Sequence, residues 1–242
     1  MKVSVLACAC ALAMTCSVSA ETLLFDFGNV NQLSPEAPNT PAWNNILRPA
    51  DGGVPPVIVD SQGNNTTVGL VFTEDFFING PPSQLGSEAP AGDAAAYPVS
   101  ATDDYLFGHT GPFAGEADNS TSSFTLFGLD PNLVYDFTFF SARNGVNDNR
   151  DTAYALTGLN SGSGVATTAN NDTEVLVISG ISPTLGGSID IDVSAAATNT
   201  NGLQFYYLNV MQIDVQEIPE PSSTLMALLG MASIGLSARL RG

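Results

Sequence analysis

The chain has 242 residues, a length that suits one large domain better than two. It is strongly acidic, with 24 Asp and Glu against six Lys and Arg, and its formal net charge is −18. Nucleic-acid binding depends on clustered Lys and Arg, so this balance excludes nucleic acid as a partner and disfavours anionic lipid surfaces.

The first 20 residues have the three parts of a secretory signal peptide. Lys2 supplies a positive start, residues 3–14 form an uncharged apolar run, and cleavage is predicted after Ala20. The three cysteines of the chain all lie in this segment, at Cys8, Cys10 and Cys16. The exported chain therefore has no thiol nucleophile, disulfide or thiolate metal ligand.

Residues 21–217 alternate between apolar and polar side chains, as half-buried β-strands do, and no long stretch has the helical period. We predict strands at residues 22–27, 57–60, 66–72, 123–127, 133–141, 152–157, 174–179, 188–193 and 203–215. Gly, Pro, Asn and Asp separate these strands, and long loops are expected within residues 31–96. This pattern predicts an all-β fold, an antiparallel β-sandwich of the jelly-roll type.

The loop at residues 143–151 is the most informative segment for a binding site, because it holds two of the three arginines between residues 21 and 217. The candidate ligand-binding residues are Arg143, Asp148, Asn149, Arg150, Asp151 and Tyr154. Three interpretations stay open: contact with a sugar or other ligand through an arginine, calcium binding by Asp148, Asn149 and Asp151, or an internal salt bridge that pins the loop. The loop lacks the ligand spacing of an EF-hand.

Catalytic machinery is only weakly indicated. His109 is the single histidine, and no nucleophile elbow accompanies it. Glycoside hydrolysis needs two carboxyl groups, and the neighbouring acidic pairs are Glu74–Asp75, Asp103–Asp104 and Asp190–Asp192. Asp190 and Asp192 alternate with isoleucines, so they should share the solvated face of one strand. We therefore predict no catalytic residue.

Aromatic side chains can provide stacking surfaces for sugars when they are exposed. The candidates are Trp43, Tyr97, Tyr105, Tyr154, Tyr206 and Tyr207. Strand alternation places Phe205 and Tyr207 on one face and Tyr206 on the other. Most tyrosines of a sandwich are partly buried wall residues, so few of these six are expected to contact a ligand.

The C-terminal tail begins with Pro219, Glu220 and Pro221, continues with an apolar run at residues 224–238, and ends with Arg239 and Arg241. The run would span roughly 22 Å as a transmembrane helix, and the arginines would hold the C-terminus in the cytoplasm. The expected organisation is a signal peptide at 1–20, a β-sandwich at 21–217 and this tail at 218–242.

This order of features resembles the PEP-CTERM sorting signal. The resemblance implies recognition and cleavage by an exosortase-type enzyme, with Pro219, Glu220, Pro221, Arg239 and Arg241 as sorting residues. It also implies a Gram-negative bacterium, transient inner-membrane insertion, and delivery to the cell surface, the medium or an exopolysaccharide matrix. An anchor that stays uncleaved is the alternative.

Residues 123–215 resemble galactose-binding-like or malectin-like jelly rolls through a strand, a Gly-Leu-Asp-Pro-Asn turn, a Tyr-containing strand and the arginine loop. Such modules often carry carbohydrate. The leading hypothesis is an exported, non-catalytic protein that binds carbohydrate or serves structurally in extracellular polysaccharide. The alternative is a glycan-cleaving hydrolase that uses a carboxylate pair. Calcium, at the 143–151 loop, is the only cofactor that the sequence suggests.

Overall fold

The computed structural model describes residues 21–78, 85–115 and 117–216. The predicted signal peptide at 1–20 and the tail with its predicted membrane helix at 224–238 lie outside these residues. Within the described part, no helix is long and apolar enough to cross a membrane. The described residues between 21 and 216 belong to one compact unit with its own hydrophobic core.

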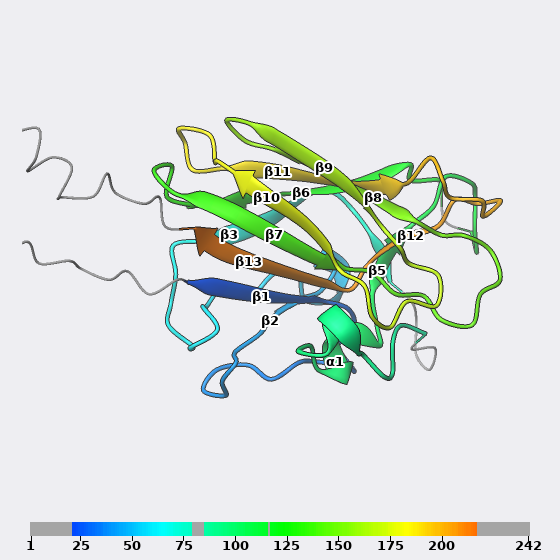
Figure 1. Ribbon diagram of the computed structural model, residues 1–242, viewed down its shortest axis with the longest axis horizontal. Coiled ribbons are helices and arrows are strands. Elements are labelled where there is room, and N and C mark those ends of the chain that lie inside the picture. The colour runs from blue at the N-terminus through cyan, green and yellow to red at the C-terminus, as the bar shows by residue number, and fades with distance from the viewer. Residues whose placement is uncertain (1–20, 79–84, 116, 217–242) are drawn as a thin grey trace, which may run out of the picture. The chain divides into compact units, whose positions relative to one another are not determined.

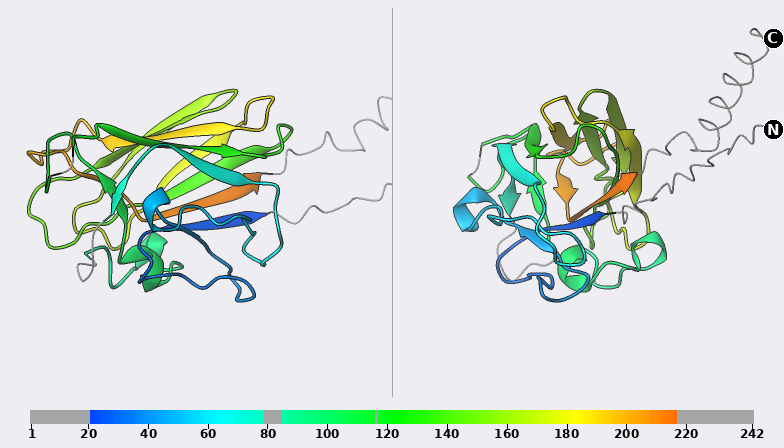
Figure 2. Two further views of the ribbon diagram at one scale, coloured as in Figure 1. Left: turned by 180° about the vertical axis from the view of Figure 1, so that it is seen from behind. Right: turned by 90° about the vertical axis from the view of Figure 1, so that its left-hand side faces the viewer.

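Two five-stranded sheets pack against each other as a sandwich (Figures 1 and 2). The first sheet contains, in order, β10 (Leu176–Ile181), β7 (Val134–Phe140), β13 (Val210–Gln216), β1 (Thr22–Phe27) and β2 (Asn44–Ile46). The second contains β3 (Gly69–Glu74), β6 (Thr121–Phe127), β11 (Ile189–Ala195), β8 (Thr152–Thr157) and β9 (Ser161–Ala166). The prediction of an all-β sandwich is confirmed, but the sheets are not wholly antiparallel because β1 and β2 pair in parallel.

A small third sheet and three short helices complete the fold. The sheet contains β12 (Tyr206–Leu208), β5 (Leu106–Gly108) and β4 (Phe77–Ile78). The helices are α1 (Val99–Thr102) and the two 3-10 turns η1 (Pro49–Asp51) and η2 (Gly92–Ala94). This third sheet matters most for the site, because β5 and β12 carry aromatic residues that line a cavity.

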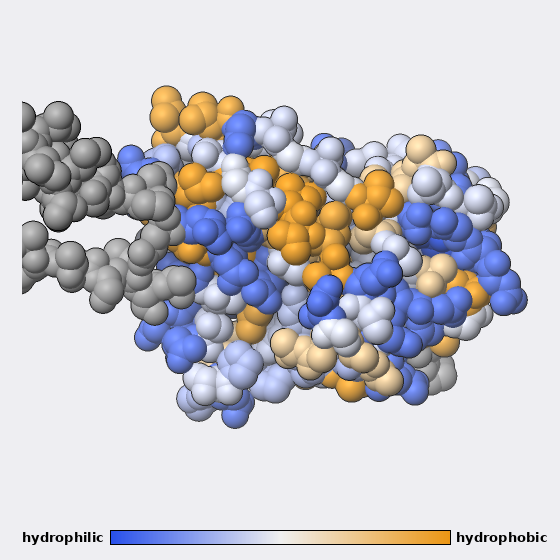
Figure 3. Space-filling model, viewed as in Figure 1, coloured by the Kyte–Doolittle hydropathy of each residue, from blue (hydrophilic) through white to orange (hydrophobic). Residues whose placement is uncertain are grey.

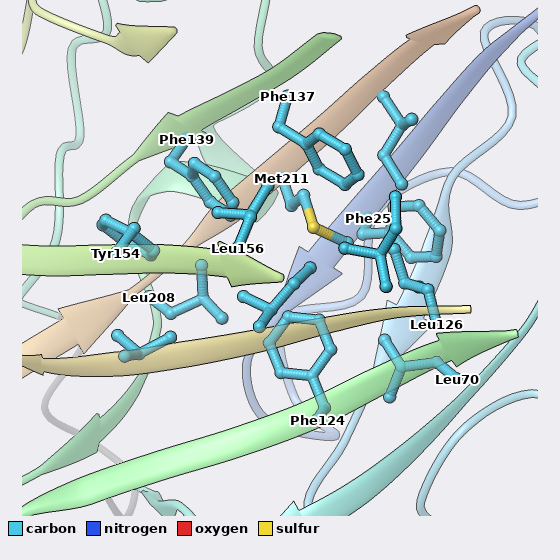
Figure 4. Close-up of a cluster of buried hydrophobic side chains, with 14 of the residues drawn as sticks. Phe25, Leu70, Phe124, Leu126, Phe137, Phe139, Tyr154, Leu156, Leu208 and Met211 are labelled. Atoms are coloured by element: carbon cyan, nitrogen blue, oxygen red, sulfur yellow. The ribbon is translucent and has the colours of Figure 1, made fainter. Parts of the chain in front are cut away.

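The core forms between the two large sheets from the inward side chains of alternating strands (Figure 4). On β11, Ile189, Ile191 and Val193 are buried while Asp190 and Asp192 are exposed, as the alternation predicts. Residues 21–216 contain no cysteine, so burial of apolar surface is the main stabilising contribution in this part of the chain.

Strand β9 was not predicted, because its sequence is rich in glycine and serine. The structure explains the glycines. A Cβ at Gly162 would lie 2.7 Å from the side chain of Ile178, and one at Gly164 would lie 2.5 Å from that of Leu176. Glycine therefore lets β10, the edge strand of the first sheet, pack its side chains onto β9. Figure 3 shows hydrophobic side chains exposed on the face where β9 and β10 lie in Figure 1. Each of these strands has an exposed valine, Val165 on β9 and Val177 on β10.

The strand predicted at 203–215 divides at Asn209, which lies between β12 and β13. The buried amide of Asn209 donates to the carbonyl oxygens of Thr102 (3.0 Å) and Asp104 (2.7 Å), and its oxygen accepts from the backbone N–H of Ala142 (2.8 Å). β12 then pairs in the third sheet and β13 in the first. The strand predicted at 57–60 is also wrong, since only a single bridge forms there, between Val59 and Asn65.

Candidate functional site

A cavity of about 220 Å³ lies where β5, β12 and the 143–151 loop meet. Its lining combines aromatic rings with two arginines: Leu85, Tyr105, Phe107, Phe113, Arg143, Arg150, Phe205 and Tyr207. None of these described lining residues is acidic. A concave, mostly apolar surface with a few polar groups is the usual form of a ligand site, and this one is the size for a single small ring rather than a long chain.

Aromatic rings form the walls and hold one another in place. Phe113 and Phe205 meet edge to face with centroids 4.9 Å apart, and Tyr105 meets Tyr207 in the same way at 4.8 Å. The ring of Phe107 lies 5.9 Å from that of Phe205. Of these walls Phe113 is the most accessible, with 42% of its surface exposed, so its ring is available for stacking.

His109 supports these walls from behind instead of facing solvent. The ring is fully buried, stacks on Phe77 at a centroid distance of 4.7 Å and lies 5.6 Å from Phe205. Its Nδ1 is 2.6 Å from the carbonyl oxygen of Gly111. This packing gives the single histidine a structural role beside the cavity.

Arg150 is held in place from several sides. Its Nε donates to Asp148 at 2.8 Å, its Nη1 donates to the Tyr207 hydroxyl at 2.6 Å, and its guanidinium lies 5.3 Å from the centre of the Phe205 ring. Burial raises the pKa of Tyr207, although Arg150 opposes that shift, so the hydroxyl stays protonated. Hydrogen bonds from Arg150 and Asn201 lower the pKa of Asp148, which stays ionised.

Arg143 lines the same cavity but makes fewer hydrogen bonds than Arg150. Its Nη1 donates to the carbonyl oxygen of Asn144, and within the described residues its guanidinium makes no other hydrogen bond and no ion pair. A guanidinium has five N–H donors, so most of them remain for a ligand. Two of the three arginines of the sandwich thus line one cavity in an acidic protein.

The structure brings together only part of the predicted site. Arg143 and Arg150 line the cavity, and Asp148 positions Arg150. Asn149 and Asp151 instead hold the loop, since Asp151 accepts hydrogen bonds from Asn149 (3.1 Å) and Thr198 (2.7 Å). The described chain contains no group of three or more acidic, histidine or cysteine side chains placed to hold a metal ion. Calcium at Asp148, Asn149 and Asp151 stays a prediction that this hydrogen bonding does not favour.

Tyr154 does not belong with the site, which corrects its inclusion among the ligand-binding residues. Its ring is buried and stacks on Phe139 at 4.2 Å, and its hydroxyl bonds Ser141 and the carbonyl oxygen of Tyr207. Inward alternation along β8 places it in the core. Trp43, Tyr97 and Tyr206 are buried as well and do not line the cavity. Tyr105 and Tyr207 are also buried, but they line the cavity. The predicted alternation is confirmed: Phe205 and Tyr207 face the cavity, and Tyr206 bonds Ser122 at 2.9 Å on the other side.

Phe107 and Phe113 are functional candidates that sequence reasoning missed. Phe107 lies on β5, a three-residue strand that the alternation could not reveal, and Phe113 lies in the following loop. The one available signal was the clustering of aromatic residues around the single histidine in residues 105–113.

A buried carboxylate cluster lies elsewhere, at the end of β1. Asp26, Asp103 and Asp104 are all buried, and each has one carboxylate oxygen with no hydrogen-bond partner among the described residues. Asp104 accepts from the backbone N–H of Asn29 at 2.6 Å, and it lies so close to Gly28 that a Cβ there would be 2.0 Å from its oxygen. Burial and the neighbouring Asp104 raise the pKa of Asp26, and burial raises the pKa of Asp104 to about 7.

None of the acidic pairs considered for hydrolysis lines the cavity. Asp190 and Asp192 are exposed on β11, Glu74 and Asp75 are exposed at the end of β3, and the Asp103–Asp104 pair is buried at the carboxylate cluster. A second cavity of about 340 Å³ is lined by residues 54–57, 66–70 and Phe127, none of them charged.

Fold and cavity together define an all-β sandwich module with an arginine-containing aromatic site. The chain also carries the PEP-CTERM protein-sorting motif at residues 217–241, which confirms that resemblance of the tail. The protein is therefore exported and bears a C-terminal tail for processing by an exosortase-type enzyme. No curated protein matches the chain by sequence.

The solved structures with weak similarity to the sandwich include the following two. One is CBM61, a carbohydrate-binding module solved in complex with β-1,4-galactotriose, which is 14% identical in sequence. The alignment covers 62% of this chain and 78% of CBM61, with a TM-score of 0.26. The other is the isomalto-dextranase of Arthrobacter globiformis T6, complexed with panose, which is 9% identical in sequence. The alignment covers 81% of this chain and 32% of the dextranase, with a TM-score of 0.29. TM-scores this low carry no inference about ligand or activity.

The position of Arg150 predicts a role in both folding and binding. Arg150→Ala should lower the free energy of unfolding by about 1–3 kcal/mol, because the Tyr207 hydroxyl and Asp148 lose a partly buried charged partner. Urea unfolding of residues 21–216 measures this loss. Arg48→Ala is the control, since the Arg48–Asp51 pair is more exposed and should contribute about 1 kcal/mol or less. Equal losses in the two variants would contradict the anchoring role.

Proposed function

We propose that this protein is a non-catalytic carbohydrate-binding module that is exported and sorted to the cell surface or extracellular matrix. The observation that carries the proposal is the cavity, whose lining includes both the accessible Phe113 ring and Arg143. Sugars present apolar faces that stack on aromatic rings and hydroxyls that accept hydrogen bonds from arginine. The anchoring of Arg150 supports this role, because polar groups held in advance lose less entropy on binding.

A glycan array probed with residues 21–216 tests the proposal, since this stretch holds the whole core. We expect binding to a restricted set of glycans, unchanged by a calcium chelator if the 143–151 loop needs no metal. Loss of binding on chelation would instead revive the calcium hypothesis. Absence of binding to every glycan would contradict the proposal and favour a purely structural role.

Hydrolysis is the second candidate, and the carboxylate cluster is what favours it, because a desolvated acid beside another acid is typical of glycosidases. The cluster does not line the cavity, so we favour binding without cleavage. Incubation of each bound glycan with the protein should release no new reducing ends. Release that disappears in Asp104→Asn would overturn this part of the proposal.

Sorting through the tail makes a prediction of its own. Glu220→Ala should leave uncleaved protein in the inner membrane, because the residue belongs to the motif that an exosortase-type enzyme recognises. Mass spectrometry of membrane and extracellular fractions measures the change, and Glu174→Ala, which replaces an exposed glutamate outside the motif, is the control. Extracellular protein at unchanged level and mass in Glu220→Ala would contradict the proposed sorting.

A further inference from the structure

We infer that the sugar recognised at the cavity carries a carboxylate, so that the ligand is a uronic-acid residue of an acidic polysaccharide. This inference rests on the proposed carbohydrate-binding function and specifies its ligand. It follows from the charge at the cavity, from the state of its two arginines, and from the geometry of a guanidinium.

Positive charge is scarce in this chain and is concentrated at the cavity. The net charge is −18, and only three arginines and no lysine lie in residues 21–216. Two of those arginines line the cavity, while the third, Arg48, pairs with Asp51 elsewhere. Among the described residues, those that line the cavity include no carboxylate. An acidic body that places its cations at one apolar cavity has a local preference for an anion.

The two arginines differ in what they already bind. Arg150 is neutralised by Asp148 and hydrogen-bonded to the Tyr207 hydroxyl, so its main role is to shape the cavity as a fixed part of the lining. Arg143 has no carboxylate partner within the described residues, and its one hydrogen bond there goes to a backbone carbonyl. A partly buried cation without a counter-charge is unfavourable, and a ligand anion supplies what is missing. Arg143 is therefore the group that selects the ligand.

A carboxylate on a sugar ring fits this arrangement better than a free anion does. The planar guanidinium of Arg143 can donate two parallel hydrogen bonds to the two oxygens of a carboxylate. The ring that bears the carboxylate can then stack on Phe113, which lines the same cavity and is 42% exposed. One unpaired arginine matches one negative charge, whereas a doubly charged phosphate would meet stronger repulsion from the acidic body.

The inference is tested with sugars that differ in charge and with arginine variants inside and outside the cavity. The probes are oligogalacturonate, oligoglucuronate and oligomannuronate, each beside its methyl ester, which keeps the ring and removes the charge; sulfated and neutral oligosaccharides complete the set. Calorimetry is carried out on residues 21–216 and on the variants Arg143→Gln, Arg143→Lys and Arg48→Gln. Both glutamine variants remove one positive charge, but only Arg143 lines the cavity. Urea unfolding confirms that each variant is folded.

We expect at least one uronate to bind more tightly than its ester. Arg143→Gln should weaken that binding by roughly 10- to 100-fold, as loss of charge-assisted hydrogen bonds does, while Arg48→Gln leaves it unchanged. Arg143→Lys should recover part of the loss, because it keeps the charge without the planar fork. Equal affinity for uronate and ester, or a preference for sulfated sugars, would overturn the inference and leave carbohydrate binding intact. Absence of binding to every probe would overturn both.

Discussion

Stability of the sandwich should fall by on the order of 2–3 kcal/mol between about pH 5 and about pH 8. The pKa of Asp104 is raised to about 7 by burial, well above the value of about 3.9 expected for an unfolded aspartate. Between these two values the folded state holds a proton that the unfolded state has released. The stabilisation is therefore complete below the unfolded pKa and is lost as pH rises through the folded one.

Urea unfolding of residues 21–216 across this pH range measures the effect. Asp104→Asn should be more stable than the parent at high pH and should depend less on pH, because the amide keeps the acceptor for the Asn29 N–H and carries no charge. Asp190→Asn on the exposed side of β11 controls for the change in net charge. Stability that stays level or rises toward pH 8 would show that Asp104 is ionised and compensated in the folded protein.

Asn209→Ala should cost about 3–5 kcal/mol, one of the largest losses expected for a polar residue. The substitution removes the amide that bonds the carbonyl oxygens of Thr102 and Asp104 and the backbone N–H of Ala142. All these groups are buried, and each unpaired one costs about 1–3 kcal/mol. The free energy of unfolding from urea titration measures the loss.

Asn160→Ala provides the matched control for Asn209. Asn160 also bonds two backbone groups, the carbonyl oxygen of Gly180 and the N–H of Ser182, both at 2.7 Å, but it does so at an exposed turn. Water can replace those bonds, so the control should lose about 1 kcal/mol or less. A similarly small loss for Asn209→Ala would mean that the junction between β12 and β13 does not depend on its amide.

The sequence predicts the long strands well and the short ones poorly. Strands β1 and β8 begin and end at the predicted residues. β8 buries one face along its length, whereas β1 is buried on both faces. Strands β4 and β5 have two and three residues, too few for alternation to show. The break at Asn209 depends on partners 67 to 107 positions away in the chain, which no local pattern contains.

Only part of the candidate site could be predicted from the sequence, because the rest depends on contacts between distant parts of the chain. Arg143 and Arg150 stood out because arginine is rare in this chain, and the structure places both at the cavity. Tyr154 looked similar in sequence, but strand alternation turns it into the core. Phe113 comes from a distant loop, so its place opposite Phe205 follows from the tertiary fold and not from any local pattern.

The affinity of Phe113→Ala for the best glycan of the array tests the central claim most directly. Phe113 is 42% exposed and lines the cavity, whereas Phe127 is 47% exposed and lies at the second cavity, so Phe127→Ala removes a similar ring from another place. Loss of one stacking ring should weaken binding by about 1–3 kcal/mol in Phe113→Ala alone, with unfolding nearly unchanged. Unchanged affinity in Phe113→Ala, or an equal loss in Phe127→Ala, would contradict carbohydrate binding at this cavity.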